Sequence, residues 1–297
     1  MSGAGALEMS AAWKRRIAAG ALVVSGCVDT PGSPMPNGLM EMAAFAQLPS
    51  RPGIEANTGR PAEGGFYVDL RNGYDGATQQ VSDWLMDAGW LIADFSPHNA
   101  RFDERGMSLH VTRREGGATP YVSAEFQRLG FYGYGRYEVV MRAAKSPGIV
   151  SSFFTHTDAA LGDPHSEVDF EFVGGEPEQV HTNYFSNGIS DALDIPLGFD
   201  ASLAPHVYAF EWLPTSIAWY VDGVEVRRVE ASAAVVPIPT ASSRVIANIW
   251  AANKHAVEWV GEADTKGASA LYVCMSHVPA GLAGRHCSDT FAAPPAK

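Results

Sequence analysis

The sequence is poor in basic residues and in long apolar runs, and each shortage excludes a class of protein. Lys and Arg number 21 against 33 Asp and Glu, a formal net charge of −12. Nucleic-acid binding needs clustered cations, so we expect no nucleic-acid partner. No apolar run after residue 26 is long enough to span a bilayer as a helix. The nine His residues lack zinc-type spacings, and neither G-x-S-x-G nor a phosphate loop occurs, so we predict no metal and no cofactor.

The residues that are present favour a turn-rich β-sheet protein with a sizeable core. The chain of 297 residues is 46% hydrophobic and contains 30 Gly and 19 Pro. Strands are predicted at 66–70, 108–114, 122–129, 134–143, 149–157, 167–173, 180–186, 206–214, 216–223, 224–230, 244–251 and 270–278. Asp222-Gly223 is typical of a two-residue hairpin turn. Because no segment of 12 residues after 64 keeps a helical period, a β-sandwich or barrel is expected.

The N-terminus has the pattern of an export signal. Basic residues at 14–16 precede a short apolar segment at 17–26, which ends in "VSGC". This ending resembles a bacterial lipobox, so residues 1–27 are predicted to be a signal peptide with lipidation at Cys27. An ordinary signal peptide is the alternative. Because Val28 rather than Asp follows, an outer-membrane lipoprotein is expected, and otherwise a periplasmic or secreted protein.

The rest of the chain divides into a tether, a domain and a tail. Residues 28–63 are rich in Pro, Gly, Ser and Asn and predict a tether, with a short helix possible at 40–48. Residues 64–280 form the predicted β-sheet domain, and 281–297 the C-terminal tail. An exported protein meets an oxidising compartment, so Cys274 and Cys287 are predicted to form a disulfide. Two buried free thiols are the alternative.

The segment "SEVDFEFVG" (166–174) places Glu167, Asp169 and Glu171 at every second position. On a strand the three carboxylates share one face. The Cα atoms of Glu167 and Glu171 then lie roughly 13 Å apart. Their side chains can lean toward the separation of about 5–5.5 Å that retaining glycosidases use. Such crowding raises the pKa of at least one carboxyl group, as a general acid requires. A solvated strand face or a cation site is the alternative.

Several segments in one order extend this pattern. They are "YGYGRYEVVMRAAKSPGIVSSFFTHT" (132–157), "SEVDFEFVGG" (166–175), "VHTNYFSNG" (180–188), "LGFDASLAPHVYAFEWLPTSIAWYVDGVEV" (197–226) and "ANIWA" (247–251). Together, over about 100–278, they resemble family 16 of the glycoside hydrolases, closest to the bacterial licheninase type. The resemblance implies an all-β, concanavalin A-like jelly-roll sandwich of two curved antiparallel sheets, with a sugar cleft on its concave face.

The resemblance also implies roles for individual residues. Glu167 matches the nucleophile, Glu171 the general acid/base, and Asp169 the residue that tunes the nucleophile. Substrate contacts are expected from Glu125, Gln127, Phe154, His165, Asn183, Phe185, Trp250 and Trp259. For Phe154 a place in the core is the alternative. Core or hairpin packing is expected for Trp84, Trp90, Trp212 and Trp219.

Some positions depart from the licheninase pattern. His165-Ser166 stands where Trp-Asp usually precedes the nucleophile, and "DPHSEVDFE" is similar to bacterial exopolysaccharide depolymerases of the same family. Ser276 stands where an Asp often holds a structural calcium, so calcium is left open and is not predicted.

The sequence therefore predicts a monomeric, retaining endo-β-glycanase that hydrolyses a β-1,3-1,4-glucan. A depolymerase of a succinoglycan-type exopolysaccharide, or a transglycosylase, is the alternative within the family. A non-catalytic, lectin-like jelly-roll is the alternative from another class. The polysaccharide substrate and the membrane anchor are the partners expected.

Overall fold

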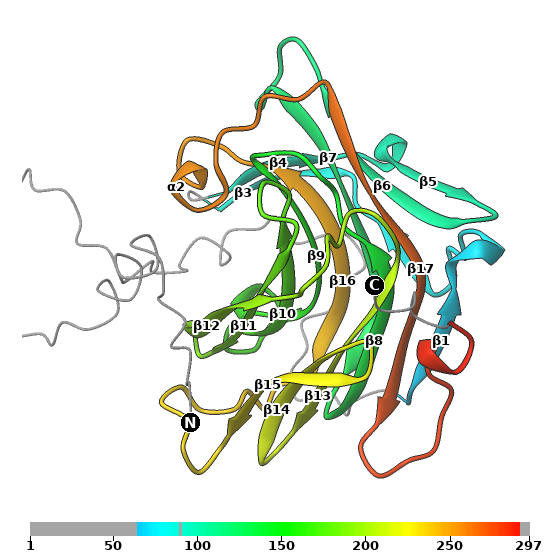
Figure 1. The fold of residues 1–297 in the computed structure, drawn as a ribbon, viewed down its shortest axis with the longest axis vertical. Coiled ribbons are helices and arrows are strands. Elements are labelled where there is room, and N and C mark those ends of the chain that lie inside the picture. Colours follow the sequence, from blue (N-terminus) through cyan, green and yellow to red (C-terminus); the bar gives the residue numbers. More distant parts are fainter. Residues whose placement is uncertain (1–63, 89–90, 292–297) are drawn as a thin grey trace, which may run out of the picture. The chain divides into compact units, whose positions relative to one another are not determined.

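The computed structural model describes residues 64–88 and 91–291, and most of these residues lie in β-strands (Figure 1). The predicted signal peptide, Cys27, the tether, the helix at 40–48 and Trp90 lie outside the described residues. The strands are β1 (Phe66–Asp69), β2 (Gln79–Val81), β3 (Trp84–Asp87), β4 (Ile92–Phe95), β5 (Ala100–Asp103), β6 (Gly106–Arg113), β7 (Tyr121–Tyr132), β8 (Gly135–Arg142), β9 (Ile149–Thr157), β10 (Ser166–Val173), β11 (Gln179–Ser186), β12 (Ile189–Pro196), β13 (His206–Leu213), β14 (Ser216–Val221), β15 (Val224–Glu230), β16 (Ser243–Ala251) and β17 (Gly267–Pro279).

Helical structure in the described residues is confined to short segments. One α-helix, α2 (Val257–Val260), follows β16. The 3₁₀ turns are η2 (Leu70–Asn72), η3 (Pro97–Asn99), η4 (Ala159–Leu161) and η5 (Cys287–Asp289). No helix among these residues has the length and apolar character that a bilayer crossing requires.

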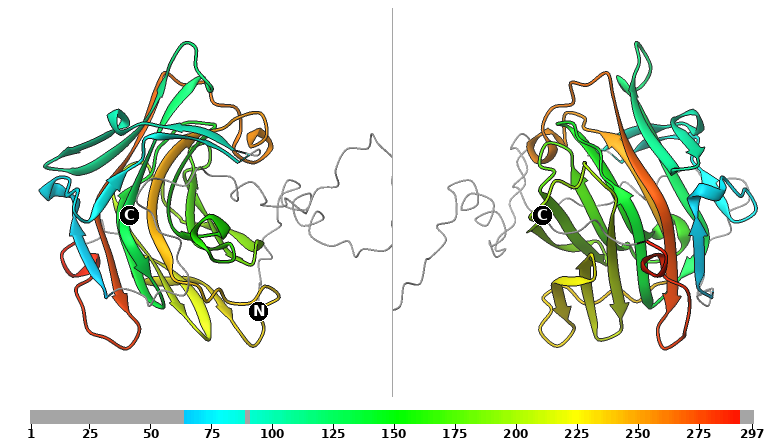
Figure 2. Two further views of the ribbon diagram at one scale, coloured as in Figure 1. Left: turned by 180° about the vertical axis from the view of Figure 1, so that it is seen from behind. Right: turned by 45° about the vertical axis from the view of Figure 1, so that its right-hand side comes forward.

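The strands form two layers, which we call the inner and the outer sheet (Figure 2). The inner sheet has the order β2-β7-β16-β9-β10-β11-β12. The outer sheet has the order β15-β14-β13-β8-β17, with β1 and β6 both beside β17. Strand β6 also pairs with β5 and with the start of β7, where the parallel pair β4–β7 adds β4 and β3. Strand β7 thus links both sheets, and the predicted jelly-roll sandwich is confirmed.

The core lies between the two sheets and follows from alternation along each strand. In β10, Val168, Phe170 and Phe172 are buried in the main hydrophobic cluster, together with Tyr208 and Trp219 of the outer sheet. The intervening side chains point to the opposite face of the inner sheet. We call this side the carboxylate face. Alternation therefore fixes both the core and the face that carries the acidic residues.

The predicted Asp-Gly hairpin is present between β14 and β15. Asp222 has φ 48° and Gly223 has φ 82°, so both turn residues are left-handed. A two-residue turn with this conformation matches the twist of the flanking strands. The sequence signal and the backbone geometry agree here because both are local.

Five strands were missed by the sequence prediction. Strands β2, β3, β4 and β5 have only three or four residues each, too few for a period to emerge. Strand β12 has eight residues, but it lies at the edge of the inner sheet and is largely exposed, so it lacks an apolar repeat. Strand β17 begins at Gly267, three residues before its predicted start. Pairing with neighbours, rather than local composition, makes these segments strands.

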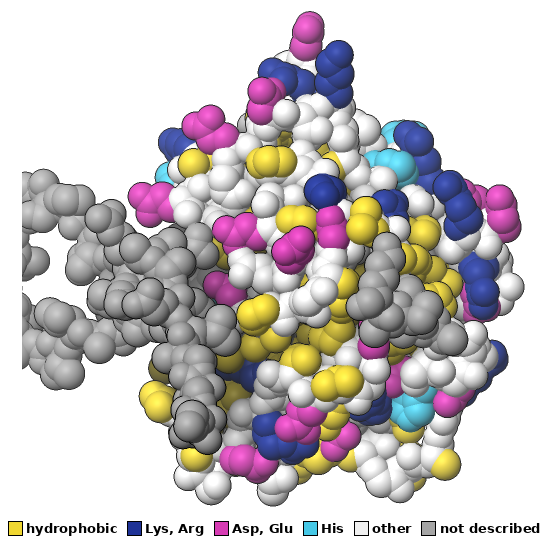
Figure 3. All heavy atoms as spheres, in the orientation of Figure 1, with side chains coloured by type: hydrophobic (Ala, Val, Ile, Leu, Met, Phe, Trp, Pro, Cys, Tyr) yellow, Lys and Arg dark blue, Asp and Glu magenta, His cyan; other side chains and the backbone are white. Residues whose placement is uncertain are grey.

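The segment predicted as a C-terminal tail packs against the domain as far as residue 291. Turn η5 contains Cys287, which forms a disulfide with Cys274 of β17. Both half-cystines are buried beside Val140 and Val207. On the face shown in Figure 3, Lys and Arg side chains are scattered among Asp and Glu, and the described residues there form no continuous basic surface.

Candidate active site

Strand β10 lies between β9 and β11, and the antiparallel register aligns polar side chains from all three strands. Glu167 is directly opposite His156 of β9 and Phe185 of β11. Asp169 is opposite Phe154 and Asn183, and Glu171 is opposite Ser152 and His181. Directly opposite residues in a sheet project to the same side. The carboxylate face therefore carries three rows of side chains across β9, β10 and β11.

The predicted substrate contacts Glu125 and Gln127 lie on β7, which pairs with β16, and β16 in turn pairs with β9. This chain of pairings places both side chains on the carboxylate face. Glu125 is opposite Asn248 and Gln127 is opposite Ile246, and these two residues lie opposite Ser152 and Phe154 of β9. Gln127 donates to Glu125 Oε1 at 2.6 Å, and Ser82 donates to the same oxygen at 2.5 Å. Both polar side chains are buried. The structure thus holds Glu125 and Gln127 in fixed positions on the carboxylate face.

Phe154 lies on the carboxylate face and is half-buried, whereas its neighbour Phe153 belongs to the core. Phe185 is also half-buried, and its ring centroid is 4.6 Å from that of His165. The Phe154 ring lies in the row of Asp169, and the Phe185 ring lies in the row of Glu167. The structure therefore places His165, Phe154 and Phe185 around the nucleophile candidate.

Trp250 and Trp259 lie beyond Glu171 along the carboxylate face. Trp250 is 2% exposed and packs in a separate cluster with Val150 and Val173. Trp259 of α2 is half-buried, with its ring centroid 6.1 Å from that of Trp250 and 5.2 Å from that of His181. The two tryptophans thus form one wall of the carboxylate face, and the ring of Trp259 is the more exposed of the two. Trp212 and Trp219 are buried in the main core, as predicted.

Glu167 is held between two histidines. Nδ1 of His156 is 2.6 Å from Oε1, and Nε2 of His165 is 3.2 Å from Oε2. Burial alone would raise the pKa of Glu167, but the charges and hydrogen bonds of both histidines outweigh burial and lower the pKa to about 2. Glu167 is therefore an anion throughout the neutral pH range, as a nucleophile must be.

The pKa values of Glu171 and Asp169 are raised, whereas that of Glu167 is lowered. Burial and the Glu167 charge raise the pKa of Glu171 to about 7, although the His181 charge opposes them. Burial, followed by the charges of Glu167 and Glu171, raises the pKa of Asp169 well above its usual value despite Arg227. Crowding and burial of the three carboxyl groups therefore raise two of their pKa values, those of Asp169 and Glu171.

Two unsatisfied polar atoms lie in the central row. Oδ2 of Asp169 and Oδ1 of Asn183 are buried and have no hydrogen-bond partner among the described residues. They belong to directly opposite residues of β10 and β11. Buried polar atoms are normally satisfied, so this pair can receive hydroxyl groups of a bound molecule.

Sequence reasoning missed His156, Asp158 and His181. His156 alternates with Ser152 and Phe154 along β9, and His181 alternates with Asn183 and Phe185 along β11. That period was visible, but only the strand register shows that these histidines face the two glutamates. Asp158 lies just after β9, where its Oδ2 is 3.4 Å from Nε2 of His156.

One group of residues could also hold a cation. His156, His165 and Glu167 each offer an atom, and these atoms lie within 4.8 Å of one another. The same atoms already make the ion pairs described above, so we assign the group to the electrostatics of Glu167.

Ser276 is buried in β17, and its hydroxyl accepts a hydrogen bond from the backbone N–H of Cys287.

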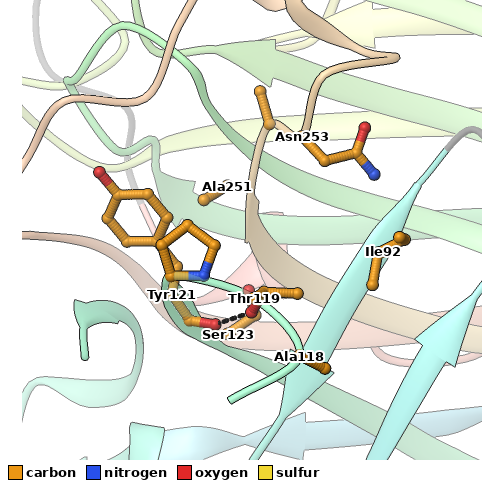
Figure 4. Close-up of a pocket in the computed structure, with 9 residues that line it drawn as sticks. Ile92, Ala118, Thr119, Tyr121, Ser123, Ala251 and Asn253 are labelled. Carbon is orange, nitrogen blue, oxygen red and sulfur yellow. Dashed lines mark hydrogen bonds between the residues drawn. The ribbon is translucent and has the colours of Figure 1, made fainter. Parts of the chain in front are cut away.

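A separate small pocket lies between β4, the start of β7 and the segment after β16 (Figure 4). Ile92, Thr119, Tyr121, Ser123 and Asn253 are among the residues that line it, and Thr119 donates to the backbone oxygen of Tyr121. No carboxylate, histidine or cysteine lines the pocket within the described ranges. We assign no chemistry to it.

Comparison with known proteins identifies relatives over the same region. The family model of the glycosyl hydrolases family 16 matches residues 90–269. A beta-glucanase of Bacillus subtilis is 37% identical over 212 residues, which cover 70% of this chain and 83% of that protein. A beta-glucanase of Acetivibrio thermocellus is 35% identical over 218 residues, or 73% of this chain, and the match spans only 63% of that relative's length.

A solved structure shares the whole fold of the described domain. It is a prokaryotic beta-1,3-1,4-glucanase (lichenase) derived from a mouse hindgut metagenome, with 33% sequence identity and a TM-score of 0.68. The match covers 73% of this chain and 100% of the solved chain. The carboxylate-bearing strand β10 lies within the matched family region.

Proposed function

The chain belongs to the glycosyl hydrolases family 16, and on this premise we propose that it is a retaining endo-β-glucanase acting on a β-1,3-1,4-glucan. The observation that carries the proposal is the divergence of two pKa values on one strand. Glu167 has a pKa of about 2 and Glu171 a pKa of about 7. A retaining glycosidase needs an ionised nucleophile and a protonated acid beside the same glycosidic bond.

The proposed reaction has two steps. In the first, an oxygen of Glu167 attacks C1 of the sugar, and the C1–O bond to the departing chain breaks. The bond pair passes to the leaving oxygen, which takes the proton of Glu171. In the second, Glu171 removes a proton from water, the water oxygen attacks C1, and the bond pair of the ester returns to Glu167. Both substitutions invert C1, so the anomeric configuration is retained.

Asp169 and Asn183 are proposed to bind the sugar at the reacting position. Their unsatisfied oxygens lie in the row between the two glutamates. The raised pKa of Asp169 favours its protonation, which would remove one negative charge from between Glu167 and Glu171. Phe154, Phe185 and Trp259 are proposed to contact the apolar faces of neighbouring sugars, since flat rings pack well on them. Glu125 and Gln127 supply polar contacts at the β7 side.

Substrate digestion tests this function. The purified protein is incubated with barley β-glucan, lichenan, laminarin and a succinoglycan-type exopolysaccharide. We expect short oligosaccharides from the first two, with the β-anomer appearing first by NMR. Glu167→Gln removes the nucleophile and abolishes product formation, whereas the matched exposed variant Glu104→Gln leaves it unchanged. Absence of cleavage by folded wild-type protein, with polysaccharide binding intact, would instead favour the lectin-like function.

An exopolysaccharide depolymerase is the second candidate function. It is favoured by His165, whose ring lies against Phe185 and beside Glu167, where licheninases usually have Trp. Cleavage of the succinoglycan-type polymer alone would support this candidate. Transglycosylation needs the same ester intermediate, and transfer to added oligosaccharide would reveal it.

We also propose that the enzyme is exported and anchored by a lipid at Cys27. The support is the basic, apolar and VSGC order of residues 14–27. The full-length protein expressed in a Gram-negative bacterium should fractionate with the outer membrane, and Cys27→Ala should release it to the periplasm. A Cys27→Ala protein that remains in the membrane fraction would contradict the anchor. Elution from gel filtration at the mass of one chain would support the expected monomer.

A further inference from the structure

His156 connects the nucleophile candidate to a second carboxylate. Its Nδ1 contacts Glu167 Oε1 at 2.6 Å, and its Nε2 is 3.4 Å from Oδ2 of Asp158. All three side chains are at least about nine-tenths buried, with 9%, 11% and 3% of the side chain exposed for His156, Glu167 and Asp158. The two nitrogen atoms of this ring thus face two acidic groups. A neutral imidazole has only one N–H and can donate to only one of them, whereas an imidazolium can donate to both.

Asp158 is itself fixed by the backbone around it. Its Oδ1 accepts the N–H of Ala160, as the N-cap of turn η4. Its backbone oxygen accepts the N–H groups of Leu161 and Asp163. Because one carboxylate oxygen is used by the cap, the other is held toward His156. No hydrogen bond or ion pair among the described residues joins Asp158 to a candidate substrate contact, so we expect its effect on the reaction to pass through His156.

The charged groups around His156 come from every neighbouring segment. Glu167 faces it from β10, and Asp158 from the end of β9. Arg244 of β16 is directly opposite it, and the ring centroid of His165 is 5.4 Å away. The two carboxylates favour the imidazolium, whereas burial opposes it. The balance raises the pKa of His156 to about 10, with burial the largest opposing influence and the Glu167 charge the largest favourable one.

We propose that Asp158 is a positioning residue that keeps His156 protonated and oriented, so that the imidazolium holds the charge of Glu167 through the catalytic cycle. The proposal rests on the nucleophilic role of Glu167 proposed above. It goes beyond that role because it assigns a function to two residues outside the E-x-D-x-E segment.

The benefit is greatest when the covalent intermediate breaks down. When Glu167 forms the ester with C1, its negative charge disappears and His156 loses that partner. Asp158 takes no part in the bond changes and still faces the imidazolium across its 3.4 Å contact. When water displaces the ester, the bond pair returns to Glu167, and its new charge meets a cation that is already oriented. Such preorganised electrostatic stabilisation lowers the barrier of the step in which charge develops.

Kinetics of Asp158→Asn test the proposal. Asn preserves the N-cap, so the turn should remain folded, but it removes the charge. An aryl β-glycoside with a good leaving group is used, so that breakdown of the intermediate limits turnover. We expect kcat to fall on the order of tenfold, KM to fall with it, and the burst of phenol to become more pronounced than in the wild type, while kcat/KM changes less. The acidic limb of kcat/KM should stay in place or move to lower pH, because His156 is protonated at acidic pH in both proteins and the variant removes a negative charge near Glu167.

His206→Asn is the matched control. His206 also pairs with an aspartate, Asp222 at 2.6 Å, but on the outer sheet away from β10. This variant should alter neither the burst nor the pH profile. His156→Asn, which keeps a neutral donor, should resemble Asp158→Asn, and His156→Phe should be slower still. Equal behaviour of Asp158→Asn and His206→Asn, or normal turnover of His156→Phe, would overturn the proposal.

A readout independent of activity separates this inference from the proposed function. Nitrogen-15 NMR of the histidine rings, assigned with His156→Asn, should show both ring N–H groups of His156 across neutral pH. In Asp158→Asn the ring should lose a proton at lower pH than in the wild type. A neutral His156 in the wild type would overturn the proposal even if glucan is cleaved. A charged His156 in a protein that cleaves no glucan would leave the charge arrangement intact and refute only the function.

Discussion

Glu167 and Glu171 have the same side chain and lie on the same face of one strand, yet their pKa values are about 2 and about 7. Burial raises both pKa values, so burial does not separate them. The separation comes from the histidines: two contact Glu167, whereas Glu171 has only the charge of His181 as a favourable partner. Histidines of β9, of β11 and of the segment just before β10 thus assign the roles of the two glutamates.

The pH dependence of kcat/KM should reflect this difference. Glu171 must carry a proton to act as the acid, so activity should be present below pH 7 and should fall as pH rises through about 7. His181→Asn removes a cation that lowers the pKa of Glu171. We therefore expect the basic limb to move to higher pH, by roughly one unit or less.

The rate of barley β-glucan hydrolysis, followed across pH in both proteins, measures the shift. His255→Asn, an exposed histidine beside α2, serves as the control and should keep the wild-type limb. A basic limb that moves to lower pH in His181→Asn would contradict the assignment of Glu171 as the acid.

At the scale of elements, the outer sheet makes hydrogen bonds to the core side of the catalytic strand β10 and of its neighbours. Trp219 of β14 donates its indole N–H to the backbone oxygen of Asp169 at 3.1 Å. Arg227 of β15 lies over the Trp219 ring and donates to the backbone oxygens of Thr182 and Asp191, in β11 and β12. The hairpin β14–β15 therefore fixes three strands of the inner sheet through buried polar contacts.

Trp219→Phe should separate this role from simple packing. Phe keeps much of the ring but loses the N–H and leaves a small cavity, so we expect unfolding free energy to drop by about 2 kcal/mol. Urea denaturation measures the loss. We expect kcat to fall as well, because the backbone of Asp169 is no longer fixed.

Trp212→Phe is the matched comparison, since Trp212 is equally buried and donates to Pro239 O at 2.9 Å, away from β10. It should cost similar stability with little change in kcat. Equal kcat values for the two variants would show that Trp219 acts only through packing.

At the scale of the whole molecule, the described chain closes on itself near its C-terminal end. Strand β1 pairs with β17, and η5 is tied to β17 by the disulfide Cys274–Cys287. Beside it, the buried carboxylate of Glu138 accepts the N–H of Ser288 at 2.9 Å and pairs with Arg136 at 2.7 Å. These contacts lie on the outer sheet and do not include the carboxylate face.

Removal of the disulfide should therefore lower stability without altering chemistry. The two cysteines are 13 positions apart in the sequence, and a loop of this size corresponds to about 3 kcal/mol. The double variant Cys274→Ala/Cys287→Ala should lose about that much unfolding free energy in urea and keep its kcat at low temperature. Wild-type protein in reductant should behave in the same way. A double variant with the same urea midpoint as the wild type would show that the bond contributes nothing to stability.

The sequence determined by itself what depends on neighbouring positions. Alternation in 166–174 placed three carboxylates on one face, and Asp222-Gly223 fixed a hairpin, because strand period and turn conformation are local. Only the tertiary structure decided which side chains face those carboxylates. In the sequence, His156 and His181 are two of many residues in alternating segments. The register of β9 and β11 with β10 is what places them opposite Glu167 and Glu171. Register is set by hydrogen bonds between segments distant in sequence, and a shift of one residue would turn both histidines into the core.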